Sequence, residues 1–182
     1  MHIRPACPAD APAITRIYNQ GIAERIATFE TRLRHVDEIE LRIRDTDWPL
    51  LVAVADAAGA QAWAGLSAYR SRDCHAGIAE FSIYVERAAR GCGLGRPLLH
   101  ALVEVAATRG FWKLVSRIFT ENLASRALCR AAGFREVGVY ERHGRLDGQW
   151  RDVVIVERLL PAALADGSGH DAHPNEDTHV EQ

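Results

Sequence analysis

The chain has 182 residues, of which 48% are hydrophobic and 25% charged, and its formal net charge is −2. These values are typical of one globular domain, and the small net charge disfavours a nucleic-acid partner. No segment approaches the ~20 apolar residues that span a bilayer, and none resembles an apolar signal segment. The four scattered cysteines lack the C-x-x-C spacing of zinc sites. We therefore expect a cytoplasmic protein without metal or membrane partners.

The N-terminal half of the chain predicts two helices among four strands. Asp10 is placed to cap a helix over residues 11–23. A second helix over residues 36–44 has Ile39 and Ile43 as an i, i+4 apolar pair. The expected strands cover residues 2–6, 50–55, 62–70 and 77–85, with a hairpin turn at 56–59.

The C-terminal half predicts helices that alternate with strands. The expected helices cover residues 97–109 and 122–132, and the expected strands cover 113–119, 136–142 and 152–159. This order predicts an α/β domain over residues 1–160, in which helices flank one central, mixed, twisted sheet. Residues 161–182 have no apolar periodicity, so we expect a disordered tail there.

A glycine-rich loop separates the strand 77–85 from the helix 97–109. It reads Arg90-Gly91-Cys92-Gly93-Leu94-Gly95-Arg96. Glycines permit a tight turn and close approach of backbone N–H groups to a ligand, and the helix N-terminus adds unpaired N–H groups. The loop therefore predicts a phosphate or pyrophosphate site. Its spacing matches neither a Walker loop nor a dinucleotide fingerprint, and an ordinary turn is the alternative.

Charged side chains surround this loop in the predicted sheet. Glu80, on the strand before the loop, puts a carboxylate near the anion site, and a simple cross-strand pair is its alternative role. Arg70 and Arg72 are two residues apart near a strand end, so we expect them on one face. Two guanidinium groups suit a carboxylate or a tetrahedral oxyanion, although a solvated strand end would also carry arginines.

Several segments resemble the phosphinothricin and arsinothricin N-acetyltransferases of the GCN5-related N-acetyltransferase (GNAT) superfamily. They are the glycine loop and residues 17–20, 28–31, 69–72, 79–85 and 148–153. The resemblance implies the GNAT fold, with acetyl-CoA as acetyl donor and the α-amine of a glutamate analogue as acceptor. It also implies resistance to that analogue and a homodimer, with Trp150 as a candidate contact.

The resemblance assigns roles to individual residues as well. Glu80 is the expected general base, because an ammonium must lose a proton before it attacks a thioester, and the Val85 N–H is expected to stabilise the oxyanion. The expected cofactor-binding residues are Ile83, Tyr84, Val85, Arg90, Gly91, Cys92, Gly93, Leu94, Gly95, Arg96 and Asn122. The expected substrate-binding residues are Phe29, Arg70, Arg72 and Ser82, where Phe29 has a core aromatic as its alternative role.

Two positions depart from the family's pattern. Many members have a tyrosine that protonates the CoA thiolate where this chain has Cys129. Either Cys129 donates the proton, or it only packs; in that case Tyr84 or solvent serves, or the thiolate leaves without an acid. A family histidine corresponds to Asp147, with His143 as the candidate replacement. Another acceptor amine, on a protein or polyamine, and a non-catalytic acyl-CoA-binding regulator are the alternative functions.

Overall fold

A seven-stranded mixed sheet forms the centre of the protein, seen here in a computed structural model that describes residues 1–55 and 59–160. The strand order is β1-β2-β3-β4-β5-β7-β6. The strands are β1 (His2–Pro5), β2 (Leu50–Val54), β3 (Ala60–Ala68), β4 (Ile78–Val85), β5 (Lys113–Phe119), β6 (Arg135–Leu146) and β7 (Gln149–Leu159). Most of the predicted turn at 56–59 and the predicted tail at 161–182 lie outside the described residues.

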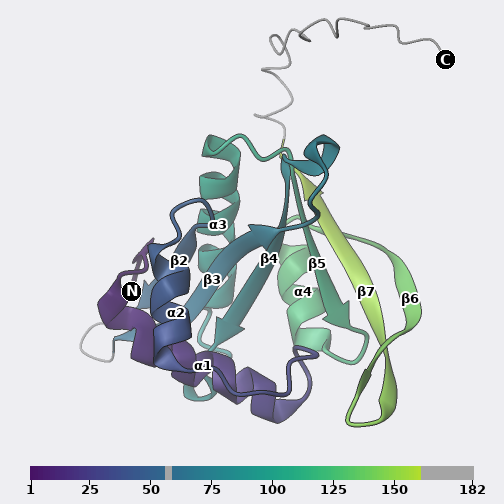
Figure 1. Cartoon of the computed structure of the whole chain (residues 1–182), viewed down its shortest axis with the longest axis horizontal. Helices are drawn as coiled ribbons and strands as arrows, with labels where there is room; N and C mark the ends of the chain where they lie inside the picture. The colour runs from purple at the N-terminus through teal and green to yellow at the C-terminus, as the bar shows by residue number, and fades with distance from the viewer. Residues whose placement is uncertain (56–58, 161–182) are drawn as a thin grey trace, which may run out of the picture.

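Helices cover both faces of this sheet. On one face lie α1 (Ala11–Glu24) and α2 (Val36–Arg44), and on the other lie α3 (Gly95–Thr108) and α4 (Leu123–Ala131) (Figure 1). Leu98, Leu99 and Leu102 of α3 are fully buried against the sheet. Replacing one such leucine by alanine typically costs about 2–5 kcal/mol, so this helix is firmly packed against β2, β3 and β4. The α/β architecture predicted from the sequence is confirmed.

The pairing of β4 with β5 is the feature of the sheet that matters most for the site. All other neighbouring strands are antiparallel, whereas these two are parallel. Their pairing covers only Ile78–Glu80 against Lys113–Val115. Beyond Glu80 the two strands diverge and open a gap in the middle of the sheet (Figure 1).

The predicted elements are confirmed, and three of the differences at their ends bear on the shape of the sheet and the site. Strand β3 ends at Ala68, so Arg70 lies outside the strand in which it was predicted. Helix α3 begins at Gly95, two residues early, because proline is tolerated in the first helical turn, where its missing N–H has no partner to lose. Strands β6 and β7 extend to a tight turn at Asp147-Gly148, where both residues have positive φ (48° and 79°), as a two-residue hairpin turn requires.

The expected side-chain cap of the first helix is absent. Asp10 stands at the N-cap of α1, but its side chain makes no cap hydrogen bond there. It accepts instead from the Cys7 backbone N–H at 2.8 Å and from both Arg4 nitrogens, at 2.7 and 2.8 Å. The carboxylate therefore stabilises the turn before α1 and ties it to β1.

Candidate active site

A cavity of about 1110 Å³ opens where β4 and β5 diverge. Its walls come from the end of α1 and the loop after it, from β4 and β5, from the glycine loop and from the start of α4. These segments lie far apart in the sequence. Only the divergence of the two central strands brings them to one cavity, whose size suits a large ligand together with a small one.

One backbone edge of β4 faces this gap. Glu86 N donates to Gln61 O at 2.8 Å, which fixes the phase of the alternating hydrogen bonds between β3 and β4. In that phase the backbone N–H groups of Ile83 and Val85 point away from β3, toward the side where β5 has separated. An extended ligand can pair with such an open edge as an added strand does.

The glycine loop continues the wall from the end of β4. Gly91 and Gly93 have φ of +79° and +80°, a left-handed backbone that glycine adopts without a steric penalty. Leu94 is the N-cap of α3, so the first turn of that helix faces the cavity. The lining includes Arg90, Gly91, Gly93, Leu94, Gly95 and Arg96. Cys92, the remaining predicted residue of the loop, is exposed and lies outside the lining.

Arg90, the first residue of this loop, is held by a carboxylate of α1. Its Nη2 lies 2.8 Å from Glu24 Oε2, and Arg87 Nε lies 2.7 Å from Glu24 Oε1. Burial by itself raises the pKa of Glu24, but hydrogen bonds from Arg90 and Arg87 outweigh it and leave that pKa lowered. Arg90 Nε also donates to the Val85 carbonyl at 3.2 Å. These contacts position Arg90 beside the open edge of β4.

Glu80 projects into the same cavity from β4. Its side chain is 21% exposed and forms an ion pair with Arg117 of β5. Arg117 Nη2 lies 2.6 Å from each carboxylate oxygen, and Nε lies 3.2 Å from Oε1. Ser82, two residues further along the strand, shares the face of Glu80 and also lines the cavity. The carboxylate is therefore accessible, on the same short strand as the open backbone edge.

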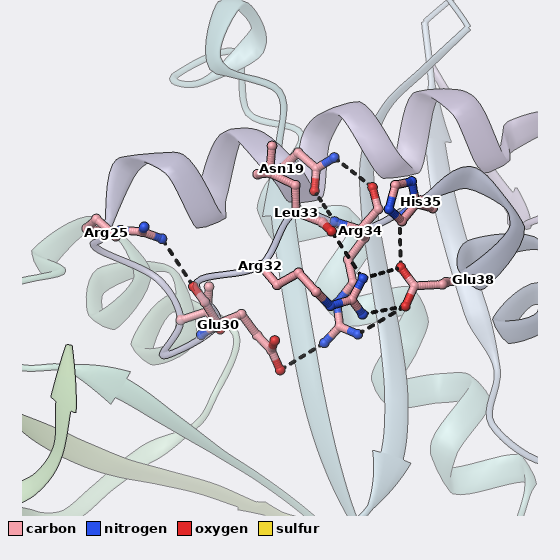
Figure 2. A network of polar contacts seen from close by, with 9 residues as sticks. Asn19, Arg25, Glu30, Arg32, Leu33, Arg34, His35 and Glu38 are labelled. Carbon is pink, nitrogen blue, oxygen red and sulfur yellow. Dashed lines mark hydrogen bonds and ion pairs between the residues drawn. The ribbon is translucent and has the colours of Figure 1, made fainter. Parts of the chain in front are cut away.

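The loop between α1 and α2 forms the opposite wall. Asn19 on α1 holds it by two hydrogen bonds with the backbone of Arg34, at 2.8 and 3.0 Å (Figure 2). Arg32 donates to Glu38 on α2, with Nη1 at 3.1 Å from Oε2 (Figure 2). Residues 26–32 of this loop line the cavity. Because the second half of this loop is hydrogen-bonded to both α1 and α2, the loop forms a defined wall.

Phe29 and His143 meet on this wall. The Phe29 ring packs edge-on against Phe119 at 4.8 Å, and the His143 ring lies 6.2 Å from it. His143 enters the cavity because β6 bulges there: the three residues between Tyr140 and Gly144 face the single residue Asp152 of β7. Phe29 thus lines the cavity and also packs against a small core, and its substrate-binding role stays a prediction.

Other predicted residues are placed differently. Arg70 and Arg72 lie in the exposed loop after β3, outside the cavity lining, and the Arg70 guanidinium lies 5.2 Å from the Tyr69 ring. The expectation that a strand face brings them together is therefore wrong, and their binding role stays a prediction. Asp147 pairs with Arg25 at 3.0 Å and also lies outside the lining, unlike His143.

Asn122 and Cys129 mark the two ends of α4. Asn122 lines the cavity and caps the helix by accepting from Ser125 N at 3.1 Å, while its amide donates to Ile26 O, also at 3.1 Å. Cys129 is 1% exposed in the main core and outside the lining. Burial raises the pKa of the Cys129 thiol to about 12. The arrangement supports a packing role for this cysteine.

The comparisons with known proteins identify the family of this chain. The sequence model of the family described as "Acetyltransferase (GNAT) domain" matches residues 1–135. The chain belongs to the GNAT acetyltransferase family. As a member it is an acetyltransferase, and acetyl-CoA is its acetyl donor.

Relatives of known name cover nearly the whole chain. The chain is 34% identical to an L-methionine sulfoximine/L-methionine sulfone acetyltransferase of Pseudomonas aeruginosa, over 87% of this chain and 94% of the relative. A phosphinothricin acetyltransferase from Sinorhizobium meliloti, solved in complex with AcCoA, superposes with a TM-score of 0.82 at 32% identity, over 87% and 88% of the two chains. A ribosomal-protein-alanine N-acetyltransferase from Brucella melitensis superposes equally well, at 34% identity, over 88% and 100%.

The described residues fit an acyl-CoA in this GNAT protein. The open edge of β4 offers backbone groups to an extended amide-bearing chain, and the positive-φ glycines with the α3 N-terminus offer N–H groups to phosphates. Among residues 1–55 and 59–160, no group of three or more metal-ligating side chains occurs and no helix is long and apolar enough to cross a membrane.

Sequence reasoning missed one residue of the site. Arg117 lies within a strand that is predicted from its apolar residues, although a charged residue in the middle of a central strand is itself a signal. The pairing of Arg117 with Glu80 was not deducible from spacing, because it depends on which strands are neighbours.

Proposed function

We propose that this GNAT enzyme acetylates the α-amine of an amino acid with a tetrahedral polar tail, of the phosphinothricin, arsinothricin or methionine sulfoximine type. The observation that carries the proposal is that Glu80, the open edge of β4 and the glycine loop line one cavity. The names of two relatives, which act on phosphinothricin and on methionine sulfoximine, support this acceptor class. Acetylation neutralises the amine, and we infer that it confers resistance to such amino acids.

Glu80 acts as the general base in this proposal. The acceptor enters as an ammonium, which cannot attack until its proton has moved to a base. The Glu80 carboxylate reaches the cavity and is placed to take that proton, directly or through one water. The bound thioester supplies an electrophilic carbonyl carbon to the neutral amine.

The backbone of β4 stabilises the charge that develops on the thioester oxygen. The N–H of Val85 faces the gap between the strands and is a fixed donor, so it needs no reorganisation during the reaction. Cys129 is buried away from the cavity, so proton delivery to the leaving thiolate falls to Tyr84 or to solvent. Burial raises the pKa of the Tyr84 phenol, which keeps its proton on at neutral pH.

The tail of the acceptor would extend from Glu80 along the wall formed by Phe29 and His143. Arg70 and Arg72 lie in the loop after β3, which leads into the end of β4 that carries Glu80. We retain them as candidate partners of the tail. Their exposed position requires that this loop move toward the cavity when substrate binds.

We further propose a homodimer formed through the last hairpin. Strand β6 is a 12-residue edge strand, which is a ready template for pairing with another chain. Large apolar side chains are exposed on β6 and β7, namely Val137, Val139, Tyr140, Trp150 and Leu159. Light scattering coupled to size exclusion would give the mass of a dimer if a second copy covers this surface.

Steady-state kinetics with four acceptors test the proposed activity: phosphinothricin, arsinothricin, methionine sulfoximine and methionine sulfone. We expect acetyl-CoA-dependent release of CoA with at least one, and Glu80→Gln should lower kcat by about 10²–10⁴-fold, the usual value of a general base. Calorimetry should show unchanged acetyl-CoA binding in this variant. Glu86→Gln is the matched control, because Glu86 follows the same strand and pairs with Arg16 outside the cavity. Equal turnover by Glu80→Gln and the control would remove the role of Glu80.

A further inference from the structure

Arg117, the ion-pair partner of Glu80, is a charged residue of the cavity to which the proposed mechanism assigns no role. The two residues are 37 positions apart in the sequence and lie on neighbouring strands. Glu80 is level with Val115, so Arg117 lies two residues further along β5, on the same face of the sheet. Both side chains line the cavity.

This pair contributes little to the stability of the fold. The Arg117 side chain is 47% exposed, and exposed ion pairs are typically worth about 0–1 kcal/mol. Every side-chain hydrogen bond found for Arg117 within the described residues goes to Glu80. The guanidinium can therefore exchange this carboxylate for another with little loss of folding free energy.

We propose that Glu80 and Arg117 together form a receptor for the zwitterionic head of an α-amino acid. Such a head carries an ammonium and a carboxylate on one carbon, and the cavity presents an anion and a cation in direct contact. Arg117 would bind the α-carboxylate by its planar fork of donors, while the α-ammonium contacts Glu80. This inference rests on the proposed function and adds to it the residue that recognises the acceptor's head.

The exchange also links recognition to the chemical step. In the free enzyme the Glu80 carboxylate accepts three hydrogen bonds from Arg117. When a substrate carboxylate takes over Arg117, Glu80 is left facing the ammonium. The ammonium then gives one proton to Glu80, the amine nitrogen forms the bond to the thioester carbon, and the carbon–sulfur bond breaks. The second proton lost by the nitrogen balances the charge on the departing thiolate.

The receptor predicts which amines are rejected. A polyamine or the N-terminal amine of a protein has no α-carboxylate. With such an acceptor Arg117 stays hydrogen-bonded to Glu80, and the base is not available to take the proton. Arg117 would thus make the enzyme prefer a free amino acid to the N-terminal amine of a protein, unlike the ribosomal-protein-alanine N-acetyltransferase to which the chain is similar.

The test compares phosphinothricin with the same molecule lacking its α-carboxyl group and with a peptide that begins with alanine. In the wild type we expect kcat/KM to favour phosphinothricin over both. Arg117→Gln should raise KM for phosphinothricin by about 10- to 150-fold, the range for a charge-assisted hydrogen bond, and Arg117→Lys should restore part of it. KM for acetyl-CoA should stay unchanged. Arg44→Gln is the matched control, since Arg44 forms a similar exposed pair with Glu40 outside the cavity.

The outcomes separate this inference from the proposed function. If the wild type acetylates phosphinothricin and its decarboxylated analogue equally well, or if Arg117→Gln slows both alike, the receptor is wrong and the acetyltransferase proposal stands. If no acceptor is turned over, calorimetry of phosphinothricin with the CoA-loaded protein decides. Binding that Arg117→Gln abolishes would support the receptor while overturning the proposed function, and no binding to the wild type would overturn both.

Discussion

The ring of Tyr84 occupies the space that a side chain on Gly21 would need. A Cβ on Gly21 would lie 2.7 Å from Tyr84 Cε1, closer than real Cβ contacts permit. The ring cannot move aside easily, because it is stacked on Trp63 at 4.9 Å and lies 5.0 Å from the Tyr18 ring. The missing side chain on α1 therefore sets how closely this helix approaches β4.

Gly21→Ala should destabilise the protein although alanine favours helices. The propensity gain is at most about 1 kcal/mol, whereas overpacking costs typically about 1–3 kcal/mol. We expect a net loss in urea unfolding and a higher KM for acetyl-CoA, because the displaced Tyr84 lies on the strand with the open edge. Gly138→Ala is the control, since nothing lies within 4 Å of its Cβ position. An unchanged urea midpoint for Gly21→Ala would contradict this prediction, because it would show that the Tyr84 ring moves aside without loss of stability.

His143 rather than Asp147 should orient the acceptor. His143 lines the cavity beside Phe29, while Asp147 lies in the hairpin turn outside it. His143→Ala should raise KM for the amino acid by about 2- to 12-fold, the equivalent of one hydrogen bond, with KM for acetyl-CoA unchanged. Asp147→Asn, which tolerates the left-handed turn, should leave both constants at wild-type values. The opposite pattern would assign the role to Asp147.

Three of the four cysteines should react with a thiol reagent in the native protein. Cys7, Cys74 and Cys92 are exposed, whereas Cys129 is buried. Burial raises the pKa of the Cys129 thiol to about 12, so its reactive thiolate is scarce near neutral pH. Spectrophotometric titration should count the fourth thiol only after unfolding in denaturant. A fourth fast-reacting native thiol would place Cys129 at the surface.

Glu157 should make the protein sensitive to acid. It is 8% exposed and pairs with Lys113 at 2.7 Å and with Arg135. The hydrogen bond from Lys113, with a further one from Arg135, lowers the Glu157 pKa from its ordinary value of 4.5 against the effect of burial. A carboxylate with a lowered pKa stabilises the fold at pH values above its pKa in the unfolded chain. That stability is lost as the pH falls through its pKa in the folded protein.

Glu157→Gln should therefore reduce the free energy of unfolding by about 1–3 kcal/mol at neutral pH, because two cations lose a buried partner. The difference from the wild type should shrink as the pH falls below 4.5. Denaturant unfolding across this range measures it. Glu104→Gln, at an exposed position of α3, is the control and should change stability by less than about 0.5 kcal/mol. A pH-independent difference would mean that Glu157 acts by packing alone.

Most of the fold was predictable from local pattern. The apolar periodicity of α1, α2 and α3 and the apolar run of β5 are properties of adjacent residues, so they predict the elements to within two residues at nearly every end. The glycine loop was equally clear, because positive φ at Gly91 and Gly93 is a local requirement that glycine meets. The sequence by itself therefore determined the order of the elements, the glycine loop that lines the cavity and the strand that carries Glu80.

The tertiary structure decided which side chains meet. Arg117 reaches Glu80 only because β4 and β5 are parallel neighbours in a particular register. His143 lines the cavity because β6 bulges, whereas Arg70 lies outside the lining because β3 ends two residues earlier than predicted. Strand order, register and bulges arise from contacts between distant segments. No periodicity within one segment encodes them, and for that reason the wall to which we assign the acceptor could be identified only in the folded chain.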